Sequence, residues 1–271
     1  MKKTVFLFLL LLSFVSIEAQ AFSSNCYWGY CNNKITGEFG SKTSAKGAIY
    51  IPADVAKLYK GKTISTVRIG LAAMARNVKV FITKNLNGES SVVKTAGNLF
   101  NGWNNVTLSS AYTIDGDAFY IGYSYNGDNK SMGRSEMYSP NACWADLGDG
   151  WKNYATDQNY EALALTIQAQ ISGEDMPKDL WIYADRNVIV KKGTPCNFEF
   201  GVINLSPRVA HKLKVSYTID NTEEKVVEFK TVMGANVEKT FTINYPGFNK
   251  DGAHTVKFNL ISVDDEADAY A

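Results

Sequence analysis

Residues 98–125 read NLFNGWNNVTLSSAYTIDGDAFYIGYSY, and two runs of alternating apolar and polar residues within them are separated by an Asp-Gly-Asp corner. A period of two, bounded by Gly and Asn, is typical of half-buried antiparallel strands. The first run follows a Gly-Trp-Asn turn, and we expect Trp103 to lie in the core beside that turn. This stretch therefore predicts an all-β protein.

Similar patterns continue on both sides of this stretch. Residues 53–59 are an exception, because their apolar spacing between Pro52 and Gly61 predicts one short helix. Roughly eight or nine strands in about 150 residues suit a sandwich of two sheets, so we predict a jelly-roll-like β-sandwich over residues 22–172. Its main strands are expected at residues 48–52, 62–71, 77–83, 91–96, 104–108, 119–125, 143–146 and 162–171.

A second region follows residues 173–179, a polar segment with Gly and Pro that we interpret as a linker. Seven strands in about 90 residues is the number found in immunoglobulin-like sandwiches, so we predict a smaller β-sandwich of this kind over residues 180–271. A further closing strand is expected after the acidic residues 264–268, which leads to the hypothesis that the sequence is the front part of a longer protein. The seven strands are expected at residues 180–184, 188–190, 196–204, 211–220, 225–230, 237–243 and 253–263.

Residues 1–21 have the features of a secretory signal peptide. Two lysines form its charged start, residues 5–12 form an apolar run that continues to residue 15, and a small-x-small signal predicts cleavage before Phe22. The alternative is a lipoprotein acylated at Cys26, but the residue before that cysteine is Asn rather than a small residue. We therefore expect an exported bacterial protein, secreted or at the cell surface, with no membrane span after signal cleavage.

Charge is balanced along the chain. The 28 basic and 27 acidic residues are interspersed and give a formal net charge of +1. A protein that binds nucleic acid concentrates Lys and Arg on one face or in one run. The sequence therefore predicts no nucleic-acid partner.

Four cysteines are expected to meet an oxidising compartment after export, where disulfide pairing is the default. Cys26 and Cys31 are close together in CYWGYC and are the candidate pair, although three pairings of the four cysteines remain open. A disulfide that closes so short a loop would contribute about 2–3 kcal/mol. No histidine occurs in the first 210 residues, which argues against a zinc site.

Motifs of catalysis are missing from the sequence. It contains no Gly-x-Ser-x-Gly elbow, phosphate loop or His-Glu-x-x-His, and we expect no enzymatic activity and no organic cofactor. Asp115 and Asp117 flank a glycine and are first of all turn residues. Together with oxygens from Asn126, Asp128 or Asn129, the same two carboxylates are a candidate calcium site.

Aromatic residues are the better candidates for binding. Tyr27, Trp28 and Tyr30 crowd around the first two cysteines, and Trp144 and Trp151 lie near the third. Aromatic rings exposed in rigid loops stack on sugars and anchor protein partners. We take these five residues as the candidate ligand-binding set, with packing in the core as an equal alternative for Trp28.

Several segments resemble a secreted β-sandwich module of Bacteroides-type bacteria. They are GYC at residues 29–31, AIYIP at 48–52, YKGKTI at 59–64, VRIGL at 67–71, VKVFI at 78–82, GWNNVTL at 102–108 and FYIGY at 119–123. Such modules accompany streptopain-type thiol proteases and hemagglutinin or adhesin proteins, including cleaved-adhesin-like domains. The resemblance covers residues 26–171, and residues 180–271 resemble the immunoglobulin-like domains that often follow. It implies a non-catalytic binding role, because the protease domain itself is absent from this sequence.

The function expected from these observations is that of a secreted or cell-surface adhesin-like protein that recognises host glycans or glycoproteins. Two alternatives remain open. The chain is then either an accessory, non-catalytic region of a larger secreted protease or hemagglutinin, or a structural subunit of a surface assembly.

Overall fold

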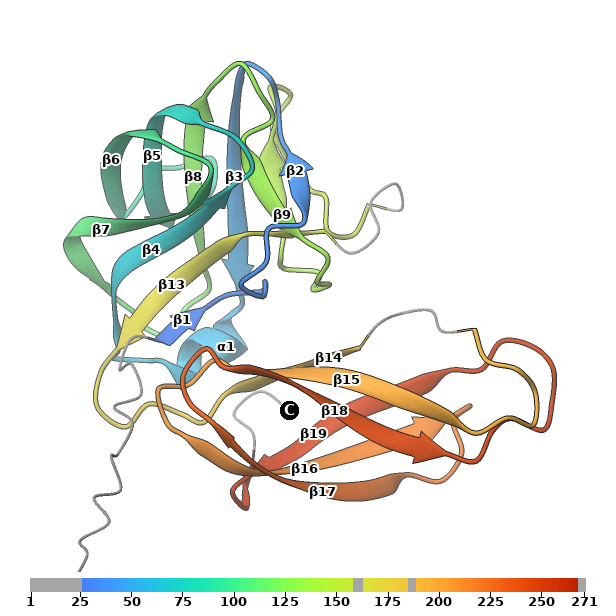
Figure 1. The fold of residues 1–271 in the computed structure, drawn as a ribbon. Coiled ribbons are helices and arrows are strands. Elements are labelled where there is room, and N and C mark those ends of the chain that lie inside the picture. The colour runs from blue at the N-terminus through green and yellow to red at the C-terminus, as the bar shows by residue number, and fades with distance from the viewer. Residues whose placement is uncertain (1–25, 158–162, 185–188, 268–271) are drawn as a thin grey trace, which may run out of the picture.

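The computed structural model describes residues 26–157, 163–184 and 189–267. The expected signal peptide, residues 1–21, lies outside this part. The described residues form two stacked β-sandwiches, one built from residues 26–172 and the other from residues 180–267 (Figure 1). The fold class is therefore the one predicted, a jelly-roll-like β-sandwich followed by a smaller immunoglobulin-like one. No helix within the described ranges has the length and apolar character needed to cross a membrane.

The first sandwich contains a seven-stranded sheet in the order β1-β13-β4-β9-β12, with β2 paired to β9 and β7 paired to β4. All of its pairings are antiparallel. Its strands are β1 (Cys26–Trp28), β2 (Gly37–Phe39), β4 (Thr63–Leu71), β7 (Gly102–Thr113), β9 (Met132–Ser135), β12 (Ala164–Leu165) and β13 (Ile167–Ser172).

A six-stranded antiparallel sheet faces it, in the order β11-β10-β3-β8-β5-β6. The expected helix is present as α1 (Ala53–Leu58), directly after Pro52. The strands of this sheet are β3 (Ser44–Ile51), β5 (Ala75–Thr83), β6 (Val92–Leu99), β8 (Phe119–Asn126), β10 (Trp144–Asp146) and β11 (Trp151–Asn153).

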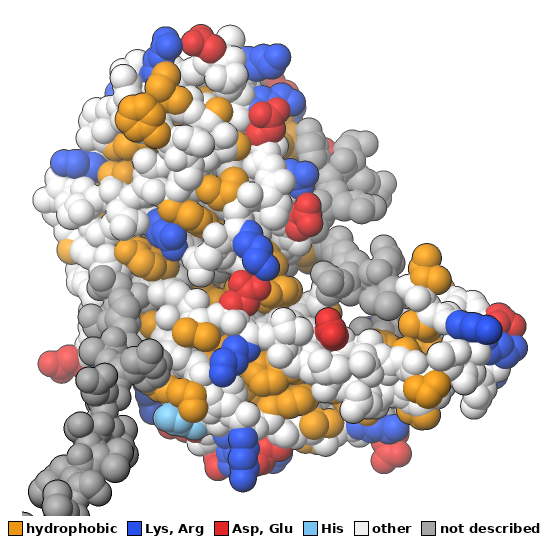
Figure 2. All heavy atoms as spheres, viewed as in Figure 1, with side chains coloured by type: hydrophobic (Ala, Val, Ile, Leu, Met, Phe, Trp, Pro, Cys, Tyr) orange, Lys and Arg blue, Asp and Glu red, His pale blue; other side chains and the backbone are white. Residues whose placement is uncertain are grey.

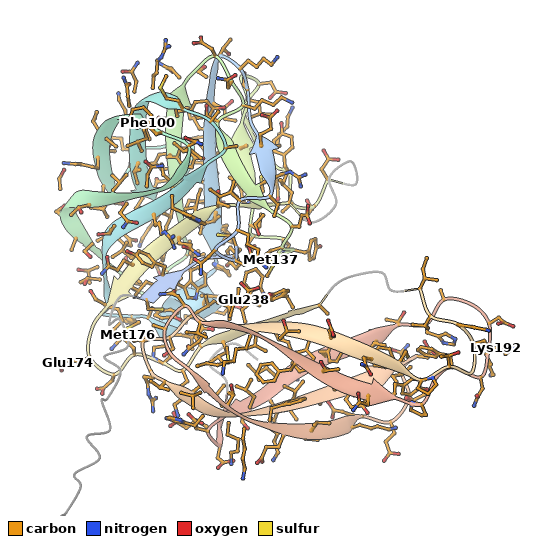
Figure 3. The ribbon with its side chains drawn as sticks, viewed as in Figure 1. Phe100, Met137, Glu174, Met176, Lys192 and Glu238 are labelled. Carbon is orange, nitrogen blue, oxygen red and sulfur yellow. The ribbon has the colours of Figure 1, made fainter. Side chains whose placement is uncertain are left out.

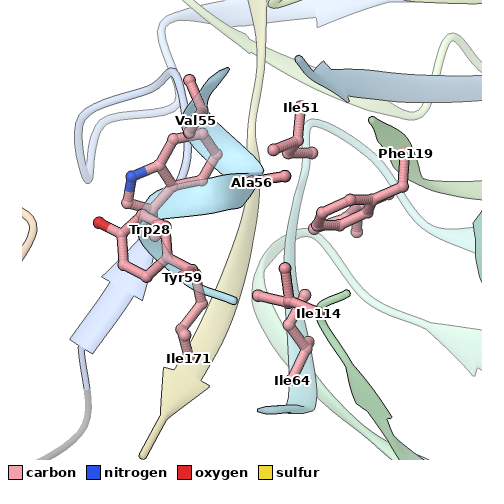
Figure 4. A pocket seen from close by; sticks show the side chains of 10 residues that line it. Trp28, Ile51, Val55, Ala56, Tyr59, Ile64, Ile114, Phe119 and Ile171 are labelled. Carbon is pink, nitrogen blue, oxygen red and sulfur yellow. The ribbon is translucent and has the colours of Figure 1, made fainter. Parts of the chain in front are cut away.

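The core lies between these two sheets and follows the alternation of the sequence. In β8, Phe119, Ile121, Tyr123 and Tyr125 are buried, while the residues between them face the other side of the sheet. Helix α1 covers one end of the core, where its side chains pack with Trp28 and leave a cavity of only about 10 Å³ (Figure 4). Each large side chain buried in this way stabilises the fold by about 1.5–3 kcal/mol.

The second sandwich has a three-stranded and a four-stranded sheet. The expected strand at residues 188–190 is wrong for Ile189 and Val190, which are not in a strand, while Val188 lies outside the described residues. A short last strand, which pairs with β19, follows a turn at Asp264 and Asp265, both with positive φ. The strands are β14 (Leu180–Ala184), β15 (Cys196–Asn204), β18 (Glu238–Tyr245), β17 (Lys225–Met233), β16 (Ala210–Ile219), β19 (Val256–Val263) and β20 (Glu266–Ala267).

Asp179 joins the two sandwiches. Its buried carboxylate accepts hydrogen bonds from Trp28 Nε1, at 2.8 Å, and from the Tyr59 hydroxyl, both in the first sandwich. Its carbonyl accepts from the backbone of Leu205 in the second sandwich, at 2.8 Å. Figure 3 shows Met176 and Glu238 at the same junction. The predicted linker is therefore a packed connection, and burial raises the pKa of the Asp179 carboxyl.

Candidate functional site

Trp28 and Tyr30 lie at the junction and are only 5% and 7% exposed. Their rings meet edge to face at 5.1 Å, and Tyr30 meets Trp181 of the second sandwich at 6.3 Å. Neither ring is exposed: Trp28 takes the alternative of packing in the core, beside Tyr59, and Tyr30 packs against the second sandwich. They do line a hollow of about 270 Å³ together with Tyr138 and Trp181, and their part in ligand binding stays a prediction.

The expected Cys26–Cys31 disulfide is absent from the structure, in which all four cysteines are free thiols. The Cys26 thiol lies against the carbonyl of Leu205, whereas the Cys31 thiol is 3.9 Å from the carbonyl of Ile167. The strand conformation at the start of the CYWGYC segment directs the two sulfur atoms to different partners. The close spacing in sequence therefore does not become a close approach in space.

The candidate calcium ligands lie at one corner of the first sandwich. The ammonium of Lys84 is 2.6 Å from a carboxylate oxygen of Asp115 and 2.7 Å from one of Asp117. The other expected ligands, at residues 126–129, lie at and beyond the far end of β8, which at about 3.3 Å per residue is some 20 Å away. They cannot complete this site. Calcium binding by the two aspartates remains a prediction, which melting with and without calcium would test.

Trp144 and Trp151 belong to a group of aromatic side chains on the outer side of the six-stranded sheet. Side chains alternate between the two sides of a strand, so residues next to the buried core positions of β3, β5 and β8 must point outward. Tyr50, Phe81 and Tyr120 are such residues, and all five rings are half-buried. We call this surface the aromatic face.

The rings of the aromatic face form two contacting groups. Tyr120 lies between Tyr50, at 4.8 Å, and Trp144, at 5.8 Å. Phe81 meets Trp151 edge to face at 6.2 Å, although their strands are not neighbours in the sheet. The β10–β11 hairpin therefore brings Trp151 across the sheet towards β5.

Small residues at the centre of the face allow this approach. Gly122 pairs with Phe81 on one side and with Ala48 on the other. A Cβ atom at Gly122 would lie 2.6 Å from Phe81 Cζ and 2.8 Å from the Ala48 Cβ. The position therefore requires glycine if the Phe81 ring is to lie over the strand.

Polar groups shape the turn before Trp151 and add hydrogen-bonding capacity beside the rings. Asp146 accepts hydrogen bonds from the backbone N–H groups of Gly148 and Gly150, at 3.0 and 3.1 Å, and pairs with Lys46 at 3.2 Å. The bond from Gly148 is the main reason why the pKa of Asp146 lies below its usual value. The Lys46 ammonium is 6.0 Å from the centre of the Trp151 ring.

Three residues of the aromatic face were missed in the sequence. Tyr50, Phe81 and Tyr120 lie in segments correctly expected to be strands, but each was counted only as part of a strand. Each of the three lies next to a buried position of its strand, and this alternation could have shown that its side chain points outward. The register that places Tyr50 opposite Tyr120 could not be obtained from either segment alone.

Trp103 lies on the outer side of the seven-stranded sheet and not in the core, so that expectation is wrong. In β7, the side chains of Val106 and Leu108 point into the core. Trp103 lies three positions before Val106, so its side chain points to the opposite side of the sheet. The Trp103 ring lies 4.1 Å from the Arg68 guanidinium, which is also 5.1 Å from the Tyr27 ring. Tyr27 is therefore half-buried on this outer surface, whereas Trp28 and Tyr30 lie at the junction.

No group of three or more His, Cys, Asp and Glu side chains able to hold a metal ion occurs within residues 26–157, 163–184 and 189–267. The aromatic rings and polar side chains described above can bind a ligand by stacking and hydrogen bonding.

Comparison with known proteins gives no family. No protein-family model matches the sequence, and neither does any curated protein. Solved structures with some similarity include a GH2 beta-galacturonidase from Eisenbergiella tayi bound to galacturonate, 11% identical with a TM-score of 0.31 over 89% of this chain. Others are the Bacteroides uniformis beta-glucuronidase, 9% identical with a TM-score of 0.31 over 86%, and a GH2 member from Bacteroides cellulosilyticus, 13% identical with a TM-score of 0.28 over 83%.

This chain spans 36%, 26% and 27% of the length of those three proteins, respectively. At such identities and TM-scores, the similarities assign neither a family nor an activity to it.

Proposed function

We propose that this is a secreted or cell-surface adhesin-like protein that binds host glycans or glycoproteins through the aromatic face and has no catalytic activity. The observation that carries the proposal is the row of half-buried rings on the outer side of a rigid sheet, including Trp144 and Trp151. Side chains on strands keep their relative positions better than side chains on loops, which favours recognition of a ligand of defined shape.

The chemistry of the face suits sugars. The apolar C–H side of a pyranose ring packs on an aromatic ring, while its hydroxyl groups need donors and acceptors at the edge. Lys46 and Asp146 supply both beside Trp151. Because these two charges neutralise each other, we propose neutral glycans as the ligands of this face.

The signal-peptide pattern and the resemblance to adhesin-associated modules support the same role, since both are typical of exported binding proteins. They also fit the second candidate, an accessory region of a larger secreted protease or hemagglutinin, and the third, a structural subunit of a surface assembly. A ligand for the isolated chain favours the first role over these two.

The experiment is a glycan array with the protein that starts at Phe22, compared with its Trp144→Ala and Trp151→Ala variants. We expect a defined set of neutral glycans to bind the parent and to be lost or weakened at least about tenfold in both variants. Phe100→Ala is the matched control, because Phe100 is an aromatic residue outside the face and is 67% exposed. If no glycan binds, or if both Trp variants bind like the parent, the proposal is wrong.

A further inference from the structure

A second arrangement of aromatic and polar groups lies on the outer side of the seven-stranded sheet. Figure 2 views the molecule from the side of β4, β7 and β13, where single Lys and Arg side chains lie apart from one another among hydrophobic and uncharged ones. Here Arg68 of β4 is held between two rings, with its Cζ atom 5.1 Å from the centre of Tyr27 and 4.1 Å from that of Trp103. The planar guanidinium is thereby fixed in position.

Within the described residues, a single nitrogen of Arg68 forms hydrogen bonds. Its Nη1 donates to Asn33 Oδ1 at 3.0 Å and to Gln168 Oε1 at 3.1 Å. Within the described part of the chain, Nη2 and Nε have no protein acceptor, and neither atom is buried. The Nε–Nη2 edge is one of the two edges with which arginine binds a carboxylate in bidentate fashion.

Arg68 also has no charged partner among the described residues. Two other arginines, Arg76 and Arg208, form ion pairs with Asp128 and Glu266. None of the ion pairs of the described residues includes Arg68. Its side chain is half-buried, and this burial lowers the pKa of the guanidinium. A half-buried cation without an anion is unfavourable by itself. An acidic ligand would supply that anion.

The surroundings of Arg68 decide what kind of acid fits. Its direct neighbours in the sheet are the amides Gln168 on β13 and Asn105 on β7, and Thr66 and Thr107 lie in the next pair. An acidic peptide or a polyanion requires several cations together. These neutral neighbours instead suit a ligand with one negative charge and several hydroxyl groups.

We propose that Arg68, Tyr27 and Trp103 form a second binding site, which takes the carboxylate group of an acidic sugar. The carboxylate lies against the Nε–Nη2 edge, Asn105 bonds a hydroxyl, and the indole of Trp103 contacts the sugar ring. Binding is non-covalent and requires no metal. The site does not depend on the aromatic face, because it lies on the opposite sheet and uses none of the same residues.

A holding role for Arg68 is the competing explanation. Its Nη1 bonds and the bond from Trp103 Nε1 to the Asn33 carbonyl, at 3.0 Å, fasten the segment after β1 onto the sheet. That role uses one edge of the guanidinium and leaves the other without a function. The experiment must therefore measure ligand binding as well as stability.

The test is a titration of the mature protein with methyl glucuronide, followed through the tryptophan indole N–H signals by NMR. We expect the Trp103 signal to shift in a saturable way, and methyl glucoside, which lacks the carboxylate, to bind at least about tenfold more weakly. Arg68→Lys keeps the charge but loses the bidentate edge, so it should weaken glucuronide binding about tenfold. Arg76→Lys is the matched control and should bind like the parent.

Three results would overturn the proposal. The first is equal binding of glucuronide and glucoside. The second is binding of acetate as tight as that of glucuronide, which would make this a site for small oxyanions only. The third is tighter, Arg68-dependent binding of a glutamate-rich peptide, which would indicate a protein partner.

A measurement on the unmodified protein covers the case in which the Arg68→Lys variant does not fold. Phenylglyoxal modifies accessible arginines, and the modified positions are identified by mass spectrometry. Glucuronide, but not glucoside, should protect Arg68 while leaving Arg76 reactive. Equal modification of Arg68 with both sugars contradicts the proposal. The Trp144→Ala and Trp151→Ala variants test glycan binding at the aromatic face and should still bind glucuronide at the Arg68 site. The two proposals can therefore fail separately.

Discussion

The guanidinium of Arg68 stacks on the ring of Trp103, with Cζ 4.1 Å from the ring centre, and the indole N–H of the same tryptophan donates to the Asn33 carbonyl at 3.0 Å. One pair of side chains thereby joins β4, β7 and the segment that follows β1. This relationship makes the outer side of the seven-stranded sheet an ordered surface. Its contribution to stability can be measured apart from any ligand.

Arg68→Lys should lower the free energy of unfolding by about 1 kcal/mol, measured by urea denaturation. Lysine keeps the charge but loses the planar stacking on Tyr27 and Trp103 and the forked hydrogen bonds to Asn33 and Gln168. Arg76→Lys should change the free energy by less than about 0.5 kcal/mol, because that arginine forms only an exposed pair. Equal effects of the two substitutions would mean that the stacking does not stabilise the fold.

Asp179→Asn should become more stable relative to the parent as the pH rises from 4 to 8. Burial raises the folded-state pKa of Asp179 above the ordinary value of 3.8, so the native state holds this proton more tightly than the unfolded state. The parent therefore has the full stability from this group below about pH 4 and loses it as the pH rises through the folded pKa. The amide of the variant does not titrate. Thermal melting of both proteins across this range measures the difference, and a constant difference would contradict the prediction.

Asp179→Ala is the companion variant. Both the Trp28 indole and the Tyr59 hydroxyl donate to the same carboxylate oxygen, which the amide oxygen of the asparagine variant can replace. Alanine removes this acceptor and leaves the buried Trp28 indole N–H without it, so we expect a loss of about 1–3 kcal/mol. Asparagine and alanine variants of equal stability would show that these hydrogen bonds contribute little.

Gly122→Ala should destabilise the protein by about 1–3 kcal/mol, because the added methyl group overfills the sheet. Its Cβ would lie 2.4 Å from the carbonyl oxygen of Gly47 and 2.6 Å from Phe81 Cζ. The change should also displace Phe81 and weaken binding at the aromatic face. Gly88→Ala is the matched control, since its nearest neighbour would be an ordinary 3.4 Å from the Cβ, and it should be neutral within about 0.5 kcal/mol. Denaturant unfolding of the pair measures both effects.

Thiol labelling should distinguish Cys196 from the other three cysteines. Cys26, Cys31 and Cys143 are fully buried, and burial raises the pKa of the Cys31 thiol to about 12. Cys196 is partly exposed. Iodoacetamide should therefore modify Cys196 first in the folded protein, and all four cysteines after unfolding without a reductant. Fewer than four modified cysteines in the unfolded protein, found by mass spectrometry, would indicate a disulfide.

Much of the architecture was accessible from the sequence because strand formation has a local signal. The alternation in residues 119–125 identified β8 and the side of it that faces the core, and the spacing after Pro52 identified α1. For Trp103 the expectation was wrong, because it was based on the Gly-Trp-Asn turn and not on the alternation that buries Val106 and Leu108 in the same strand. Closeness in sequence misled for Cys26 and Cys31, since it does not report the direction of side chains.

The sequence by itself determined the fold class, the two-sandwich order and the chemical types available for binding, because alternation and turn residues act over a few positions. Only the tertiary structure decided which aromatic rings meet. It brought Phe81 to Trp151 and Arg68 to Trp103, and it buried Trp28 against Asp179. These contacts depend on strand register and on the packing of the second sandwich against the first, and both are set by residues far apart in the chain.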